Sequence, residues 1–223
     1  MKVNKKKELE EKYNLLSSNF SLREYRNLNH YMEHRAELLL NWGKKVRDGD
    51  TILELGCGDG YVASSVLAKT NGRVNYIATD FSEGMLRETV SRCNSLKYSV
   101  QVKKLDINNY ELLEDLPRVD CCVAFMRTFF NYARDPQKTL TILRRKIRKK
   151  IIVDFNPRKI SETEVLKTMK ICGFSNIEIR GFFVPLRLYL PFIFIKGLIL
   201  LEGSFLRKLL TKRKFNCLVK GEI

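Results

Sequence analysis

Three glycines at alternate positions, Gly56, Gly58 and Gly60, follow a short apolar run that has an acid, Glu54, near its end. Glycine has no Cβ, so a loop of this kind turns sharply and lets a ligand lie directly against the backbone. Residues 61–69 then form an expected helix, whose first N–H groups have no partner within the helix and point toward a ligand. A strand, a glycine loop and a helix in this order indicate a site for a nucleotide-like cofactor.

The E-x-G-x-G-x-G spacing of residues 54–60 differs from that of two common nucleotide sites. A dinucleotide site has G-x-G-x-x-G with an acid about twenty residues further on, and a phosphate loop ends in lysine followed by serine or threonine. Neither pattern is found here. Two further acids accompany the next expected strands, because Asp80 ends the strand that starts at Val74 and Asp106 follows the strand at 98–103.

In order along the chain, these segments resemble the motifs of the class I S-adenosylmethionine-dependent methyltransferases. The resemblance covers the glycine loop, the acid at Asp80 with F-S-E-G-M-L at 81–86, L-D-I at 105–107, and the expected strand V-D-C-C-V-A-F at 119–125. Four motifs at ordinary intervals are more specific than one glycine loop. The resemblance implies an enzyme that transfers a methyl group from S-adenosylmethionine.

The resemblance also implies roles for these residues. The glycines would let the backbone approach the methionine part and the ribose, Glu54 would lie near the methionyl amine, and Asp80 would bind both ribose hydroxyls. Asp80 as a helix cap and Met85 as core filling are the alternatives for those two residues. The residues expected to bind the cofactor are Glu54, Gly56, Gly58, Gly60, Asp80, Phe81, Met85, Asp106, Ile107 and Phe125.

The elements that must position this loop alternate between strands and helices. Strands are expected at 51–55, 74–79, 98–103, 119–125 and 151–155, with helices at 61–69, 83–94, 136–148 and 161–172. Such alternation favours a parallel sheet covered on both faces. Two more expected strands, 174–183 and 215–219, correspond to the closing antiparallel pair of the family. We therefore expect an α/β, Rossmann-like, doubly wound sheet of seven strands, mostly parallel with an antiparallel last strand.

The chain length of 223 residues fits one medium domain. We expect N-terminal lid helices over 1–46 and a methyltransferase domain over 47–223. Residues 1–19 suit a frayed helix, and 21–46 one amphipathic helix with Ser21 as its N-cap, followed three residues later by Glu24. Its expected apolar stripe consists of Leu28, Tyr31, Met32, Leu38, Leu39 and Trp42.

An apolar insertion at 184–211 precedes the last expected strand, and fifteen of the twenty residues at 182–201 are apolar. Pro185, Pro191, Arg187 and Lys196 interrupt it, and a membrane span needs ~20 apolar residues, so a span is not expected. Three interpretations remain open. The segment is a helix buried under the sheet, a wall of an apolar substrate pocket, or a helix that lies in the membrane interface.

Residues for the methyl acceptor are much less defined, and the catalytic group is unknown from the sequence. The N-P-P-Y or D-P-P-Y of DNA amino-methylating enzymes is absent after the strand at 119–125. Residues with suitable side chains near the acceptor are His30 and His34 on the lid, with Arg127, Asn131 and Tyr132 after that strand. Passive roles for both histidines are the alternative. No metal is expected, because two histidines without further ligands do not make a zinc site.

Lysine and arginine number 41 against 25 acids, a formal charge of +16, which attracts anionic partners. Basic residues cluster at 144–150 and 207–214, although cations also favour helix C-termini. The leading hypothesis is a small or lipid-linked acceptor, apolar or anionic, with peripheral contact to an anionic membrane. RNA methylation and a catalytically silent cofactor-binding protein are the alternatives. Scattered cysteines and no signal-peptide pattern predict a cytoplasmic setting.

Overall fold

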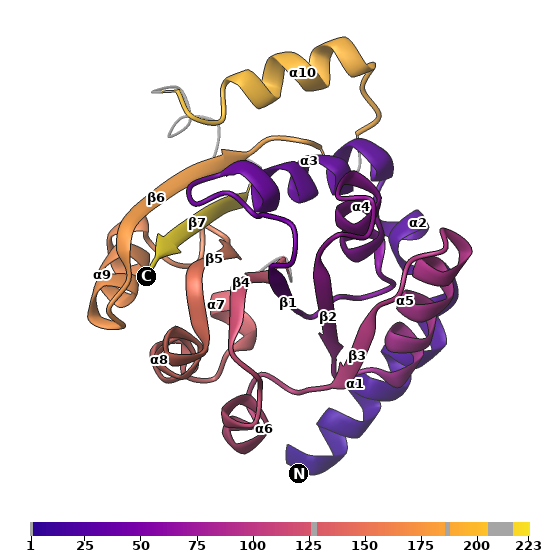
Figure 1. Cartoon of the computed structure of the whole chain (residues 1–223), viewed down its shortest axis with the longest axis horizontal. Helices are drawn as coiled ribbons and strands as arrows, with labels where there is room; N and C mark the ends of the chain where they lie inside the picture. The colour runs from indigo at the N-terminus through magenta and orange to yellow at the C-terminus, as the bar shows by residue number, and fades with distance from the viewer. Residues whose placement is uncertain (1, 126–128, 186–187, 205–215) are drawn as a thin grey trace.

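The computed structural model describes residues 2–125, 129–185, 188–204 and 216–223, which form a seven-stranded sheet in the order β3-β2-β1-β4-β5-β7-β6 (Figure 1). The strands are β1 (Thr51–Leu55), β2 (Asn75–Asp80), β3 (Gln101–Lys104), β4 (Val119–Ala124), β5 (Ile147–Phe155), β6 (Ser175–Phe182) and β7 (Asn216–Glu222). Strands β1 to β5 run parallel, and β7 pairs antiparallel with both β5 and β6. This topology confirms the expected α/β Rossmann-like fold.

Helices cover both faces of the sheet (Figure 1). They are α1 (Lys2–Leu16), α2 (Phe20–Glu24), α3 (Leu28–Asn41), α4 (Tyr61–Lys69), α5 (Glu83–Ser95), α6 (Tyr110–Glu114), α7 (Phe129–Tyr132), α8 (Pro136–Lys146), α9 (Glu162–Ile171) and α10 (Phe192–Leu200). One core cluster lies between the sheet and α3, α4 and α5, and a second lies between the sheet and α6, α8 and α9. Neighbouring residues of a strand point to opposite faces, so Cys121 belongs to the first cluster and Cys122 to the second.

Strand β5 begins at Ile147, earlier than the expected residue 151, because its charged residues make internal contacts. Both carboxylate oxygens of Asp50 accept hydrogen bonds from Lys149 Nζ at 2.6 Å. Lys150 is fully buried, and its Nζ donates to the carbonyl of Trp42 at 2.8 Å. These two lysines of the 144–150 cluster therefore stabilise the fold instead of forming a free basic surface. The second basic cluster, at 207–214, lies outside the described residues.

The N-terminal segment differs from the expectation in two places. Residues 21–46 form two helices, α2 and α3, instead of one, and Ser21 lies inside α2. Its N–H and hydroxyl donate to the Asp59 carboxylate at 3.0 and 2.5 Å, so Ser21 ties α2 to the glycine loop and is not an N-cap. Helix α1 is not frayed where it meets α5, because Asn14 Oδ1 accepts hydrogen bonds from Ser82 Oγ and the Gly84 N–H.

Asn27 lies in the break between α2 and α3, with φ −109° and ψ +44°, and its buried side chain holds the start of the insertion. Its Nδ2 donates to the carbonyls of Pro185 and Leu188 at 3.0 and 2.7 Å, and its Oδ1 accepts from the N–H of Leu190 at 3.3 Å. The expected apolar stripe of the lid is nevertheless buried in full.

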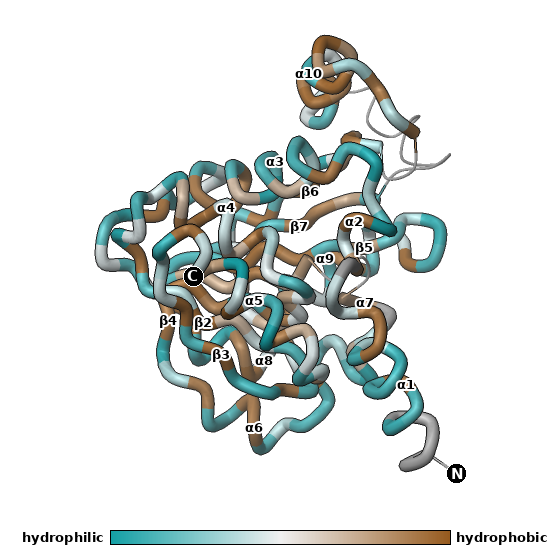
Figure 2. The backbone as a smooth tube through the Cα atoms, turned by 90° about the vertical axis from the view of Figure 1, so that its right-hand side faces the viewer, coloured by the Kyte–Doolittle hydropathy of each residue, from teal (hydrophilic) through white to brown (hydrophobic). Residues whose placement is uncertain are grey.

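Helix α10 lies outside the body of the domain, beyond α3 and β6, and is largely apolar (Figures 1 and 2). Of its residues only Ile195 is buried. The interpretation of the insertion as a helix buried under the sheet is therefore wrong for α10. No helix within the described ranges is long and apolar enough to cross a membrane.

We predict that Asn27→Ala lowers the free energy of unfolding by about 2 kcal/mol, since each lost hydrogen bond is worth ~1 kcal/mol. Hydrogen exchange should also become faster in residues 188–200. Asn41→Ala is the matched control, because Asn41 is exposed and bonds only the nearby Glu37. Equal stability of both variants would show that Asn27 does not hold the insertion.

Candidate active site

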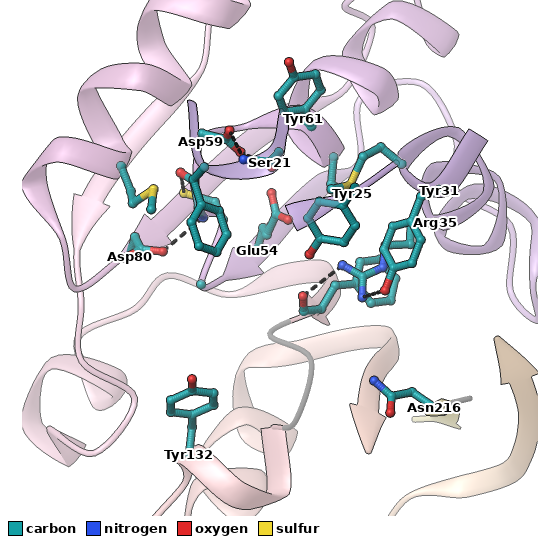
Figure 3. Close-up of a pocket in the computed structure, with 18 of the residues that line it drawn as sticks. Ser21, Tyr25, Tyr31, Arg35, Glu54, Asp59, Tyr61, Asp80, Tyr132 and Asn216 are labelled. Carbon is teal, nitrogen blue, oxygen red and sulfur yellow. Dashed lines mark hydrogen bonds between the residues drawn. The ribbon is translucent and has the colours of Figure 1, made fainter. Parts of the chain in front are cut away.

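A cavity of about 1230 Å³ lies beside the carboxyl ends of β1, β2 and β4 (Figure 3). Open α/β sheets bind ligands at this edge. Figure 3 shows Glu54 between Asp80 and a group formed by Tyr25, Tyr31 and Arg35, with Tyr132 at the opposite side. The glycine loop, the lid helices and the insertion all contribute residues to the lining, so three separate parts of the chain meet around one space.

Nine of the ten residues expected to bind the cofactor line this cavity. They are Glu54, Gly56, Gly58, Asp80, Phe81, Met85, Asp106, Ile107 and Phe125. The tenth, Gly60, packs against α5 instead. Its φ is +81°, and a Cβ at this position would lie 2.7 Å from the Cα of Thr89. Close packing of the loop against α5 is therefore the structural reason for this glycine.

The Asp80 carboxylate is fixed from two sides. Its Oδ2 accepts from the Gly58 N–H at 3.0 Å, and its Oδ1 accepts from the Ser82 N–H at 2.9 Å. Helix α5 is capped by the Ser82 side chain, which accepts from the N–H of Met85, so the helix-cap alternative for Asp80 is wrong. Burial raises the pKa of Asp80 to about 6, although the two backbone N–H groups oppose this shift.

Glu54 is buried and accepts a hydrogen bond from the Tyr76 hydroxyl at 3.0 Å. Burial raises the pKa of Glu54 to about 8, against the hydrogen bond from Tyr76 and the charge of Arg35, which lower it. The negative charges of Asp80 and Asp59 add to the increase. A cation bound beside Glu54 would relieve this repulsion and favour its ionised form.

Arg35 of α3 was missed by the sequence analysis, although it lines the cavity and is only 3% exposed. Its Nη1 donates to the Phe125 carbonyl and its Nη2 to the Tyr31 hydroxyl, both at 3.0 Å. Its Nη2 also lies 3.6 Å from Asp154 Oδ2. Burial alone would lower the pKa of Arg35, but charges including those of Tyr31, Tyr25 and Asp154 raise it overall. The sequence signal was a charged residue in the middle of the apolar stripe.

The far end of the cavity combines an apolar wall with a polar rim. The wall comes from β6 and the insertion, with Phe182, Val184, Pro185, Leu188, Leu190 and Leu198. The rim comes from the segment after β5 and the start of β7, with Asn156, Arg158 and Asn216. Tyr132 and Arg134 also line the cavity, but next to Asp106 and Ile107, because Asn108 donates to the Tyr132 carbonyl at 3.1 Å and accepts from the Arg134 N–H at 2.6 Å. The insertion is thus a pocket wall along part of its length.

The residues suggested to act on the acceptor do not all lie at the cavity. Tyr132 lines the cavity and is half exposed. The ring of His30 instead stacks on Phe192, with centroids 4.6 Å apart, and His34 Nε2 lies 2.7 Å from Glu202 Oε2. Neither histidine lines the cavity; both contact the insertion. Arg127 lies outside the described residues, as does the side chain of Asn131.

A family model described as a methyltransferase domain matches residues 52–150, from β1 into β5. The chain carries a class I S-adenosylmethionine-dependent methyltransferase domain. The predicted enzyme class and cofactor, S-adenosylmethionine, are thereby confirmed. No curated protein sequence matches this methyltransferase.

Solved structures share the fold of this methyltransferase at low sequence identity. A methyltransferase from Aquifex aeolicus is 19% identical with a TM-score of 0.58, over 96% of this chain and 98% of that chain. Magnesium protoporphyrin IX methyltransferase from Synechocystis, with bound S-adenosylmethionine, is 15% identical with a TM-score of 0.57, over 87% and 80%. The cyclase SpnF is 12% identical with a TM-score of 0.65, over 96% and 94%. At these identities the comparisons establish the fold and not the acceptor.

Within the part of the chain that the structure describes, no three histidine, cysteine or acidic side chains are grouped to hold an ion. All six cysteines are buried, and none of them forms a disulfide. Burial raises the pKa of Cys57, Cys93, Cys121 and Cys122, which makes these thiols poor nucleophiles.

We predict that Glu54 makes the cofactor-free protein less stable as the pH rises from about 5 to 8. The pKa of Glu54 is about 8 in the folded state against 4.5 for a free glutamate, so the folded protein holds one more proton in this window. The loss is on the order of a few kcal/mol. The free energy of unfolding, measured with urea at several pH values, should depend less on pH in Glu54→Gln than in the unmodified protein. The same reduced dependence in Glu111→Gln, an exposed glutamate of α6, would contradict the assignment.

Proposed function

We propose that the enzyme methylates a small or lipid-linked acceptor with an apolar body and an anionic group, by in-line displacement at the methyl of S-adenosylmethionine. One observation carries the proposal. A single cavity joins the glycine loop and Asp80 to the apolar wall of the insertion. Its volume of about 1230 Å³ exceeds the ~300–1,000 Å³ typical of small-molecule sites, which supports the binding of donor and acceptor side by side.

In this proposal the donor half of the cavity holds the cofactor. Asp80 accepts from both ribose hydroxyls, since its carboxylate lines the cavity and is already oriented by Gly58 and Ser82. Phe81 and Ile107 enclose the adenine, and Asp106 accepts from its N6. Glu54 stabilises the positive charge of the methionine part. In this arrangement the acidic side chains of the cavity bind the cationic cofactor.

The acceptor half is proposed to bind an amphipathic anion. Its wall consists of aliphatic and aromatic side chains, which favour an apolar body. Arg158 at the rim supplies positive charge after the carboxyl end of β5. A ligand that spans the two would place its apolar part against the insertion and its anionic group at the rim.

The chemistry requires position and exclusion of water more than reactive side chains. Positive charge disappears from the sulfur as the acceptor attacks the methyl carbon, and correct alignment is worth ~7–11 kcal/mol. Arg35 holds the lid helix α3 against the ends of β4 and β5 through Phe125 and Asp154. Tyr25 and Tyr31 of the lid thereby cover the region next to Glu54, where the reacting groups would meet.

RNA methylation is less well supported than a small acceptor. Its main motivation was the excess of basic residues, yet Lys149 and Lys150 bond internally. The catalytically silent alternative is set aside, because the chain carries a methyltransferase domain. An RNA acceptor would show binding that weakens steeply with salt.

We predict that Asp80→Ala weakens binding of S-adenosylmethionine by ~10–100-fold, since hydrogen bonds to a charged group contribute ~1.5–3 kcal/mol. Binding to the unmodified protein should also weaken below about pH 6, because protonated Asp80 accepts fewer hydrogen bonds. Calorimetry measures both effects. Asp115→Ala, which removes an exposed acid after α6, is the control. Unchanged binding by Asp80→Ala would overturn the proposed donor site.

We predict that Arg158→Gln weakens binding of decanoate by about threefold to fivefold. Exposed ion pairs contribute up to ~1 kcal/mol, so the loss should be modest. Binding of decanol, which has the same chain without the charge, should not change. Calorimetry with S-adenosylhomocysteine present measures both ligands, and Arg87→Gln on α5 is the control. Equal losses for decanoate and decanol would argue against an anionic acceptor.

A further inference from the structure

Helix α10 has an inner apolar face that belongs to the cavity and the core. Ile195 is fully buried, Leu198 lines the cavity, and Ile199 packs against the core cluster beneath α3. This face accounts for only part of the apolar side chains of the helix. The remaining side chains therefore need a separate explanation.

The outer side of α10 exposes large apolar side chains to the surroundings. Three of them are between 61% and 82% exposed: Ile193, Phe194 and Leu200. Tyr189, just before the helix, is 72% exposed and extends the same apolar segment. We call these four side chains the outer face. Large contiguous apolar surfaces of this kind mark sites of interaction, because soluble monomers rarely expose them.

The outer face is presented on a firmly attached segment. Phe192 stacks on His30 of the lid, and Glu202 after the helix is fully buried. Its Oε1 accepts from the N–H of Phe183 at 2.8 Å, and its Oε2 lies 2.7 Å from His34 Nε2. With Asn27 at the other end, these contacts fix α10 beyond α3 and β6, where both views show it projecting from the body (Figures 1 and 2).

The charge around the outer face favours an anionic partner. Residues 183–201 contain no aspartate or glutamate. Lys196 is exposed on α10, with its Nζ 4.5 Å above the ring of Phe192. The whole chain carries a formal charge of +16. Apolar side chains mixed with cations are typical of helices that lie in the interface of an anionic bilayer.

We propose that the outer face of α10 docks on the surface of an anionic phospholipid bilayer. The helix lies in the interface with Ile193 and Leu200 in the acyl boundary and Lys196 at the headgroups. Because the inner face of the same helix walls the cavity, an apolar acceptor dissolved in the bilayer has a short path to the methyl donor. Only this last step rests on the proposed function; docking does not.

The test is flotation of the full chain with vesicles of phosphatidylglycerol and phosphatidylcholine. We expect binding to mixed vesicles that weakens with salt and is much lower for pure phosphatidylcholine. The double variant Ile193→Ser, Leu200→Ser should bind ~100-fold more weakly, since each buried large apolar side chain is worth about tenfold. Its matched control is Leu96→Ser, Ile171→Ser, which removes an exposed leucine just after α5 and an exposed isoleucine at the end of α9.

A charge variant separates headgroup attraction from apolar insertion. Lys196→Glu should weaken binding to the anionic vesicles severalfold, while Lys167→Glu, on the exposed side of α9, should not. Equal vesicle binding by the Ile193→Ser, Leu200→Ser variant and its control would overturn the proposal. So would a dimer, seen by light scattering and abolished by the same variant, without vesicle binding. Calorimetry with S-adenosylmethionine on every variant keeps a failure of docking distinct from a failure of the donor site.

Discussion

The buried guanidinium of Arg35 is the contact on which the closed arrangement of this protein depends. A buried charge is costly unless it is bonded on several sides; Arg35 is bonded through Nη1 and Nη2, whereas its buried Nε has no hydrogen-bond partner within the described residues. The guanidinium bonds Tyr31 within α3, the Phe125 carbonyl after β4, and lies next to Asp154 of β5. The rings of Tyr31, Phe125 and Phe182 lie around it at 4.5 to 5.4 Å. The lid helix is thereby locked to the sheet at the edge where the cavity opens.

Charge is divided along the cavity in a way that suits two unlike ligands. Glu54, Asp59 and Asp80 gather around the glycine loop, and the charges of Asp59 and Asp80 raise the pKa of Glu54, so this end favours a cation. Arg158 lies after β5, two strands away from β1 in the sheet. The donor end is formed by strand ends and the loop between them, which pack into the sheet. The acceptor end is formed by the lid and the insertion, which reach it through side-chain hydrogen bonds such as those of Asn27.

The sequence predicted well what depends on neighbours along the chain. Strand β1 and helix α4 begin and end at the expected residues, because apolar periodicity and the glycine loop delimit them. The predictions from the sequence failed where a contact with a residue far away in the chain determines the local structure. Asn27, at the break in the lid helix, bonds the insertion. Lys150 is buried in β5, where the Trp42 carbonyl accepts a hydrogen bond from its ammonium group. Arg35 and the exposure of α10 likewise follow from tertiary contacts, which no local pattern reports.

Phe182 and Asn216, which flank the insertion, are paired residues of the antiparallel strands β6 and β7. The segment between them therefore leaves the sheet and returns to it at one point, and its removal or replacement would leave the register of the other strands intact. The insertion can therefore be regarded as a segment that is exchangeable as a unit. Segments of other length and composition, grafted between the same two residues, offer a route to enzymes with altered acceptors and an unchanged methyl donor.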